Sequence, residues 1–411
     1  MRFRRTTIAI VLGLAVLGAP LLSATAAALR RPSPAEVNYG MFLINQRLER
    51  LWAIQPPPWD HLLNEYNVTF GAYPLSEEGK AALFAVARIE AGRGNLLAAR
   101  RACLQIMQFY PNGTKLDNFW EGGGPIDLKH AAQLQWARLI QDDNAALQVL
   151  DDPALRLADG VVGSPYAPSP WYGPVQVERA LVRAPILMRK GKGAQAVDGL
   201  LDVLEKHGRE PRLADGRVLP ASQALLDRLE RLLEQRAVEP PRLYMVLGRI
   251  KQACDNPADA ARSLLLEGRA LSVRAVVDNN RSRFGQAQDL YVRTALQSGA
   301  VPIFAQDRVV PADVEAVERL AGLARLGYMP QQVMMRLERL ARDARCSEQC
   351  AGHAWLEHAR LTLDLLDSPG QARYGLGIVL DRYSDVPAYV ESSPGLTLGE
   401  IAMRRQRKLV K

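Results

Sequence analysis

Apolar residues recur every three or four positions along most of this chain, the spacing that lines one face of an α-helix. Near the beginning, Ser33-Pro34-Ala35-Glu36 has the pattern of a capping box, and an apolar stripe follows it. Pro56-Pro57-Pro58 then predicts a stop and an irregular linker to about residue 75. Five later segments are predicted to be helices: residues 128–150, 220–236, 283–298, 313–326 and 330–344.

Four stretches resemble a stricter pattern, in which a small residue on one helix lies twelve positions before an alanine on the next; in the last of them Arg360 replaces the small residue. The clearest covers residues 79–112, with Ala87 and Ala99 on successive helices and Gly94 at the turn. Alanine at a helix crossing lets two helices approach closely. In the other three stretches, the alanine that corresponds to Ala99 is Ala196, Ala260 and Ala372, respectively.

This arrangement resembles the tetratricopeptide repeat, a 34-residue helical hairpin. The resemblance implies an all-α fold, a right-handed superhelical solenoid of hairpins that follows an N-terminal signal or anchor. We expect residues 1–29 to be that segment, 30–75 a helix and linker, 76–390 the repeat body and 391–411 a basic tail. The resemblance also implies a surface that binds other proteins.

Two segments interrupt the helical rhythm, residues 112–126 and 158–175. Both are rich in glycine, proline and aromatic residues. Long loops inside a compact array are often functional, and aromatic side chains are favoured anchors at protein interfaces. The candidate interface residues are Trp120, Tyr166, Trp171 and Tyr172. The alternative is that these rings cover the side of the array.

Composition supports a helical body and locates its charge. Aromatic residues make up 6% of the chain and hydrophobic residues 48%, which suits close helix packing better than a β-rich core. The net charge of +8 comes from the two ends, so that residues 8–403 sum to zero. A neutral body has no basic face for phosphate backbones, and nucleic acid is therefore not an expected partner. Attraction of the terminal Arg404, Arg405, Arg407 and Lys408 to anionic lipid is the alternative to a solvated tail.

The amino-terminal segment has the features of an export signal. Three arginines precede an apolar run, and Ala24-Thr25-Ala26 is a small-residue cleavage site. The uncharged stretch 6–29 is also long enough to span a bilayer if it is not cleaved. We expect an exported, periplasmic protein, either released or anchored in the inner membrane by residues 6–29.

Candidate chemistry concentrates in residues 346–358, which hold two of the four cysteines and two of the five histidines. On one helix, Cys346, Cys350, His353 and Glu357 would share a face, which suits zinc, but a second ligand pair is missing. A disulfide between Cys346 and Cys350 requires a break in the helix, and Gly352 and the preceding basic residues suggest an interhelical turn. Free thiols, or pairing with Cys103 or Cys254, remain alternatives.

Other catalytic signatures are missing, since neither HExxH nor GxSxG occurs. Asp142-Asp143 and Asp151-Asp152 are better explained as caps at helix starts than as acid–base pairs. We therefore expect a non-enzymatic scaffold without cofactor, metal or small-molecule substrate. Its partners would be proteins of the bacterial cell envelope, in a polysaccharide export, pilus or secretion assembly. Two alternatives stay open: a periplasmic enzyme with an α-helical toroid, and a thiol- or metal-dependent protein that uses Cys346 and Cys350.

Overall fold

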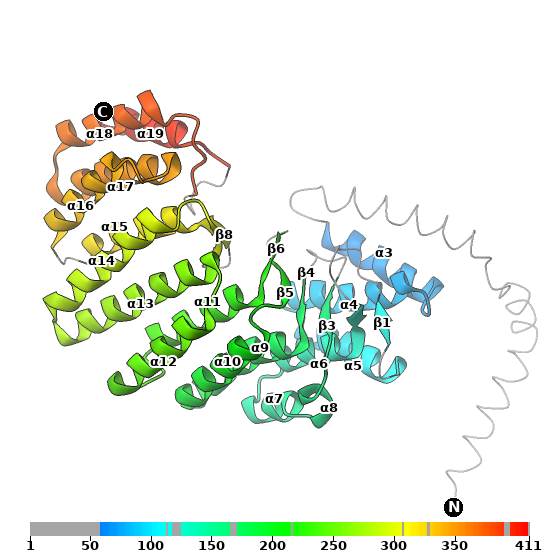
Figure 1. Cartoon of the computed structure of the whole chain (residues 1–411). Helices are drawn as coiled ribbons and strands as arrows, with labels where there is room; N and C mark the ends of the chain where they lie inside the picture. Colours follow the sequence, from blue (N-terminus) through cyan, green and yellow to red (C-terminus); the bar gives the residue numbers. More distant parts are fainter. Residues whose placement is uncertain are drawn as a thin grey trace, which may run out of the picture. The chain divides into compact units, whose positions relative to one another are not determined.

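The computed structural model describes residues 58–111, 114–116, 125–164, 171–214, 217–305, 308–326, 329–389 and 395–409. The chain divides into two compact units, Met1–Val86 and Ala87–Lys411, and the boundary falls inside helix α4. The predicted signal segment, the capping box at Ser33 and the tail residues beyond 409 lie outside the described residues. Over the part that is described, the protein is mostly helical (Figure 1).

The first unit corrects the expected linker after Pro58. Helix α3 occupies Trp59–Ala72, and α4 begins at Glu77 and ends at Gly92. Proline is tolerated at a helix start, and Leu62, Leu63 and Tyr66 are buried at helical spacing. These apolar residues outweigh the stop signal, which marks where α3 starts.

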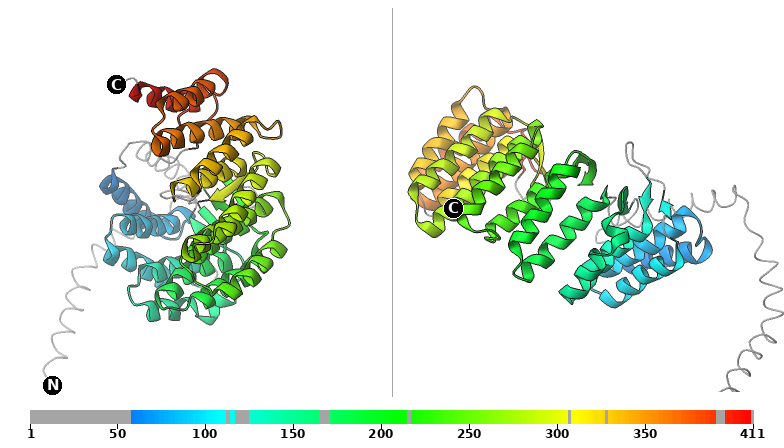
Figure 2. Two further views of the ribbon diagram at one scale, coloured as in Figure 1. Left: turned by 90° about the vertical axis from the view of Figure 1, so that its left-hand side faces the viewer. Right: turned by 60° about the horizontal axis from the view of Figure 1, so that its bottom comes forward.

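The second unit contains the remaining helices, which lie side by side in pairs in Figures 1 and 2. They are α5 (Leu96–Phe109), α6 (Leu128–Leu139), α7 (Asp143–Leu150), α8 (Pro153–Arg156), α9 (Val175–Arg189), α10 (Gly193–His207), α11 (Ala221–Glu234), α12 (Pro240–Ala253), α13 (Pro257–Asp278), α14 (Arg281–Gln297), α15 (Ala312–Arg325), α16 (Pro330–Arg342), α17 (Glu348–Leu366), α18 (Pro369–Arg382) and α19 (Leu398–Lys408). All five segments predicted from periodicity are helical, and 128–150 forms two helices, α6 and α7.

Small residues occupy three of the four predicted crossings. Ala99, Ala196 and Ala372 are each 2% exposed or less, and Gly94 has a φ of +81°, in the left-handed region that favours glycine at a turn. Ala260 is exposed instead, because α13 packs chiefly against α14 and α11 and only lightly against α12. Ala260 therefore does not lie at a close helix crossing, contrary to the prediction.

Short β-hairpins between helices were not predicted. They pair β1 (Lys115–Leu116) with β2 (Ile126–Asp127), β3 (Val161–Ser164) with β4 (Trp171–Pro174), β5 (Pro211–Ala214) with β6 (Arg217–Pro220) and β7 (Pro302–Ala305) with β8 (Arg308–Pro311). The first six strands form one sheet in sequence order, and β7–β8 forms a second. The segment 158–175 is therefore not an irregular loop over its described residues.

The three hairpins built from four-residue strands, β3–β4, β5–β6 and β7–β8, each cap the helix that follows. Pro174, Pro220 and Pro311 stand at the N-cap positions of α9, α11 and α15, and none of them offers a capping side chain. The first amide of each helix instead donates to a carbonyl just before the hairpin: Val175 to Gly160, Ala221 to Glu210 and Ala312 to Val301. Backbone amides at a helix start need such acceptors, so the strands replace the usual cap.

The hairpin and its helix recur at a fixed interval. Pro211, Arg217 and Pro220 return as Pro302, Arg308 and Pro311, each 91 positions later, and α11 returns as α15 with the same interval at both ends. The second helix after each of these also packs in the same way, since α13 packs on α11 and α17 packs on α15. The second unit therefore contains an internal structural repeat longer than a single helical hairpin.

Candidate functional site

The disulfide between Cys346 and Cys350 is formed, with the two Cα atoms 5.8 Å apart. Helix α16 ends at Arg342, and α17 begins at Glu348 with Ser347 as its cap, whose hydroxyl accepts from the Cys350 amide at 3.0 Å. The pair therefore lies across an interhelical turn, as predicted. Gly352 does not mark that turn: it lies inside α17, where a Cβ would come within 2.7 Å of the Leu398 side chain.

The remaining members of the proposed zinc face are engaged elsewhere. His353 is 1% exposed, and its Nε2 lies 3.3 Å from the carbonyl oxygen of Pro387. Burial lowers the pKa of His353 to about 4. Glu357 forms ion pairs with Arg325 and Arg360. Among the described residues, no group of three or more His, Cys, Asp or Glu side chains is arranged to hold a metal ion.

The other two cysteines are free thiols. Cys103 is buried and Cys254 is half-buried, and burial raises the pKa of each thiol to about 12. A thiol that stays protonated is neither a nucleophile nor a good metal ligand. The pairings of Cys346 or Cys350 with these residues, considered above, do not occur.

Of the four aromatic interface candidates, Tyr172 is the one whose side chain the structure describes. Trp120 and Tyr166 lie outside those residues, and Trp171 begins strand β4. Tyr172 is 1% exposed, and its backbone is paired with Gly163 of β3 and Leu213 of β5. The Tyr172 ring is therefore buried and is not an exposed anchor.

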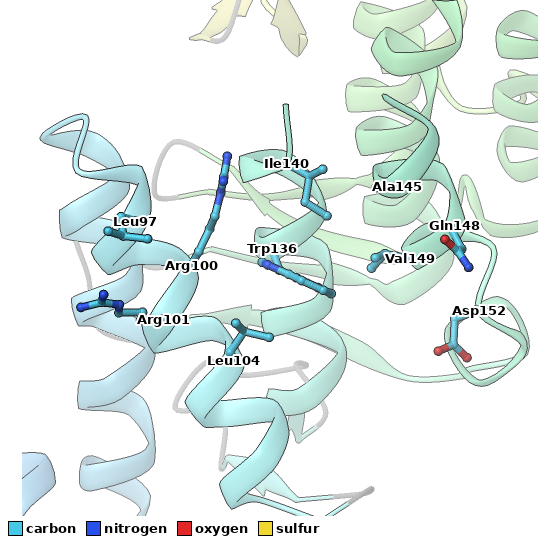
Figure 3. A pocket seen from close by; sticks show the side chains of 10 residues that line it. All are labelled: Leu97, Arg100, Arg101, Leu104, Trp136, Ile140, Ala145, Gln148, Val149 and Asp152. Atoms are coloured by element: carbon cyan, nitrogen blue, oxygen red, sulfur yellow. The ribbon is translucent and has the colours of Figure 1, made fainter. Parts of the chain in front are cut away.

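An apolar groove runs between helices α5, α6 and α7 (Figure 3), with a volume of about 650 Å³. Its lining residues are Leu97, Arg100, Arg101, Leu104, Trp136, Ile140, Ala145, Gln148, Val149 and Asp152. The half-buried ring of Trp136 lies between the side chains of α5 and α7 in this view. Leu97 is 60% exposed at the mouth. Sequence analysis missed the groove because its residues come from three helices with separate periodic patterns.

Charge is distributed unevenly around this groove. On the α5 side, Arg101 is exposed, while Arg100 donates from Nε to the Leu139 carbonyl oxygen at 2.8 Å. On the opposite side, the Asp152 carboxylate caps α8 by accepting from the Ala154 amide at 2.8 Å. Asp142 caps α7 in the same manner, so one carboxylate of each predicted pair is a cap. The other members, Asp143 and Asp151, form ion pairs with arginines of α9. The groove thus has an apolar floor and a cationic rim on α5.

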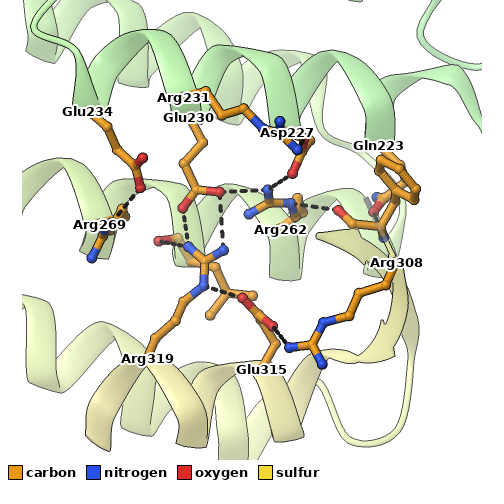
Figure 4. Close-up of polar contacts among 12 residues, drawn as sticks. Gln223, Asp227, Glu230, Arg231, Glu234, Arg262, Arg269, Arg308, Glu315 and Arg319 are labelled. Atoms are coloured by element: carbon orange, nitrogen blue, oxygen red, sulfur yellow. Dashed lines mark hydrogen bonds and ion pairs between the residues drawn. The ribbon is translucent and has the colours of Figure 1, made fainter. Parts of the chain in front are cut away.

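A buried ionic network joins α11, α13, α15 and strand β7 (Figure 4). Arg262, 0% exposed, donates to Asp227 at 3.1 Å and to Glu230 at 2.6 Å, and its Nε donates to the Phe304 carbonyl oxygen at 2.9 Å. Arg319 contacts Glu230 and Glu315. Burial alone would raise the pKa of Glu230, but the two guanidinium groups outweigh it and lower that pKa to about 2.

Most polar groups of this network bind one another, although Arg262 Nη1 and Glu315 Oε2 are buried without a hydrogen-bond partner among the described residues. Next to it, the Gln223 side-chain oxygen accepts from the Phe304 amide at 3.0 Å, and Ser222 donates to Asp259 at 2.6 Å. Carboxylates held by arginine inside a protein stay ionised and are poor proton acceptors. The network therefore holds the hairpin β7–β8 against three helices.

The basic residues near the carboxyl end lie on helix α19 and do not point the same way. Arg404, Arg407 and Lys408 are exposed, whereas burial lowers the pKa of Arg405, which lies close to Arg360, Glu357 and Asp364. Thr397 and Glu400 form a capping box at the start of this helix. At α18, by contrast, the N-cap residue Ser368 makes no side-chain capping bond, although Ser368-Pro369-Gly370-Gln371 has the sequence of a capping box.

Comparison with known proteins gives no relative on which to base a function. The sequence matches no protein-family model, and no functionally characterised protein is significantly similar to it. Over the described residues, no helix is both long enough and apolar enough to cross a membrane. The expected anchor, residues 6–29, lies outside that range.

Proposed function

We propose that this chain is a non-enzymatic, protein-binding scaffold of the cell envelope. In this proposal its helix pairs form a right-handed, tetratricopeptide-like solenoid, tethered or exported through residues 1–29. Mostly helical secondary structure, paired helices with buried alanines at their crossings, and a closed disulfide of the kind that persists in oxidising compartments support it. No observation favours the enzyme or thiol alternatives.

The observation that carries the proposal is the groove between α5, α6 and α7. Its floor of Leu104, Trp136 and Val149 is apolar and open to solvent, and grooves of several hundred Å³ bury a few side chains of a ligand. Tryptophan is among the residues that contribute most to binding energy at protein interfaces. The site therefore suits a polypeptide segment that inserts a large apolar side chain.

The positive charge at the rim of the groove indicates which residues the bound polypeptide segment should contain. Arg101 is exposed beside the floor, so a carboxylate that flanks the apolar side chain would form a charge-assisted hydrogen bond there. We therefore assign the groove to a partner segment with an acidic residue next to a bulky apolar residue. Such electrostatic complementarity sets specificity and association rate more than affinity.

Site-specific photo-crosslinking in cells tests this function. A benzoylphenylalanine replaces Leu97 at the groove mouth and, as the control, Leu365 on α17, which is 41% exposed and far along the chain from the groove. We expect a defined protein adduct from position 97 that is absent from position 365, and Arg101→Gln should weaken it. Equal adducts at both positions, or none at 97, would overturn the proposal.

A further inference from the structure

The outer face of α19 is a compact cationic surface. Leu398, Ile401 and Ala402 are buried against α17 and α18, which orients the helix. On the opposite side, Met403, Arg404, Arg407 and Lys408 are exposed. Met403 and Arg407 are four positions apart, as are Arg404 and Lys408, and Arg404 and Arg407 are three apart. Side chains at these spacings are neighbours on a helix, so the three cations and one apolar side chain form a continuous surface.

The positive charge of this surface is not neutralised by ion pairs. Within the described part of the chain, none of Arg404, Arg407 and Lys408 has a carboxylate within ion-pair distance. The single acid of α19, Glu400, accepts from the Thr397 amide at 2.9 Å in the capping box. Arg373 of α18 donates to the Leu409 carbonyl oxygen at 2.6 Å and adds a further cation at the carboxyl end.

We propose that this outer face of α19 binds the surface of a membrane rich in anionic phospholipid. Lipid phosphates are a dense, planar array of acceptors, which matches several cations on one exposed helix face better than it matches a single buried pocket. The exposed Met403 adds apolar area at the boundary between headgroups and acyl chains. Residues 8–403 carry no net charge, and the basic excess that follows them begins on α19.

The binding is independent of the groove and of the scaffold function proposed above. It relies on Arg404, Arg407 and Lys408, and Arg405 does not take part because its side chain is turned toward α17. Each cation close to an anionic membrane contributes about fivefold to the partition coefficient. Neutralising the three together should therefore weaken binding about a hundredfold.

A fluorescent reporter on the face itself provides the test. The full chain with Met403→Cys is labelled with an environment-sensitive dye and mixed with phosphatidylglycerol vesicles or neutral phosphatidylcholine vesicles. The control label is placed at Met335→Cys on α16, where the side chain is similarly exposed. Because each dye reports only its own surroundings, the result does not depend on how other segments bind the vesicle.

We expect a blue shift at position 403 with anionic vesicles alone, which salt of about 1 M abolishes by screening. Replacing Arg404, Arg407 and Lys408 by glutamine should abolish the shift, whereas replacing Lys206, Arg281 and Arg339, three exposed cations elsewhere, should not. The proposal is overturned if the dye responds equally to both lipids, if position 335 responds as strongly, or if only an acidic polypeptide such as polyglutamate produces the shift.

Discussion

Arg262 is a charged side chain that is 0% exposed, and its surroundings explain how it is tolerated. Moving a guanidinium out of water costs several kcal/mol unless carboxylates and other acceptors compensate. Asp227, Glu230 and the Phe304 carbonyl oxygen supply them. Both carboxylates also lose their hydration, so the stability of this region depends on keeping the set intact.

We predict that Arg262→Met lowers the free energy of unfolding by about 3–5 kcal/mol, because the buried carboxylates of Asp227 and Glu230 lose the guanidinium that they share and keep one arginine each. The matched control is Arg269→Met on the same helix, whose pair with Glu234 is 41% and 33% exposed and should contribute less than about 1 kcal/mol. Urea unfolding followed by circular dichroism measures both. Equal losses in the two variants would contradict the assignment of Arg262 as the centre of the network.

At the scale of the secondary-structure element, the hairpin and helix act together. A strand that ends in proline delivers the chain to a helix start, and the residue before the hairpin supplies the missing acceptor. The disulfide serves a similar purpose at a later turn, since Cys346 precedes α17 and Cys350 lies in its first turn. Both devices fix the direction in which a helix leaves a turn.

Removing the disulfide by Cys346→Ala and Cys350→Ala should lower the free energy of unfolding by about 2 kcal/mol, the chain-entropy expectation for so short a loop. Reducing the wild-type protein should have the same effect. Cys254→Ala, which removes a free thiol and keeps the disulfide, is the control and should respond to reductant as the wild type does, whereas the double alanine variant should not respond. Mass spectrometry of unreduced peptides checks the link, and a wild-type protein insensitive to reductant would contradict its role.

The helices and the disulfide were predictable from sequence, and the hairpins and the network were not. Buried faces such as that of α11 repeat every three or four residues and leave a clear local signal. A four-residue strand such as Arg217–Pro220 is too short for a period of two to stand out, although Asp215-Gly216 is a recognised turn signal. Arg262 looks like an ordinary helical arginine, because its partners come from α11 and β7.

At the scale of the whole chain, the free energy of unfolding depends on pH through two groups whose pKa values are shifted in opposite directions. Burial raises the pKa of Glu318 to about 7, against the opposing effect of Arg308. Burial lowers the pKa of His353 to about 4. The raised pKa of Glu318 stabilises the folded chain below pH 4.5, and this contribution is lost as the pH rises to 7. The lowered pKa of His353 stabilises the folded chain above pH 6.5, and this contribution is lost as the pH falls to 4. Over most of this range the two effects oppose each other.

Single variants should therefore separate the two linkages. Relative to the wild type, Glu318→Gln should gain stability as pH rises from 4.5 to 7, because it lacks the carboxyl whose ionisation is unfavourable. His353→Phe should lose stability relative to the wild type as pH rises from 4 to 6.5. Each change should be on the order of 2–3 kcal/mol, since one pKa unit corresponds to about 1.4 kcal/mol.

Differences between variant and wild type cancel both the other titrating groups and any constant cost of the substitution. Urea unfolding at a series of pH values from about 4 to 8 measures them. Glu338→Gln on α16 is the control, because that carboxylate pairs with Arg342 at the surface, where 38% of its side chain is exposed. Its difference from the wild type should stay within about 0.5 kcal/mol across the range. Parallel curves for Glu318→Gln and the wild type would show that the pKa of the Glu318 carboxyl is the same in the folded and unfolded chain, which would contradict the prediction. Parallel curves for His353→Phe and the wild type would show the same for the His353 imidazole.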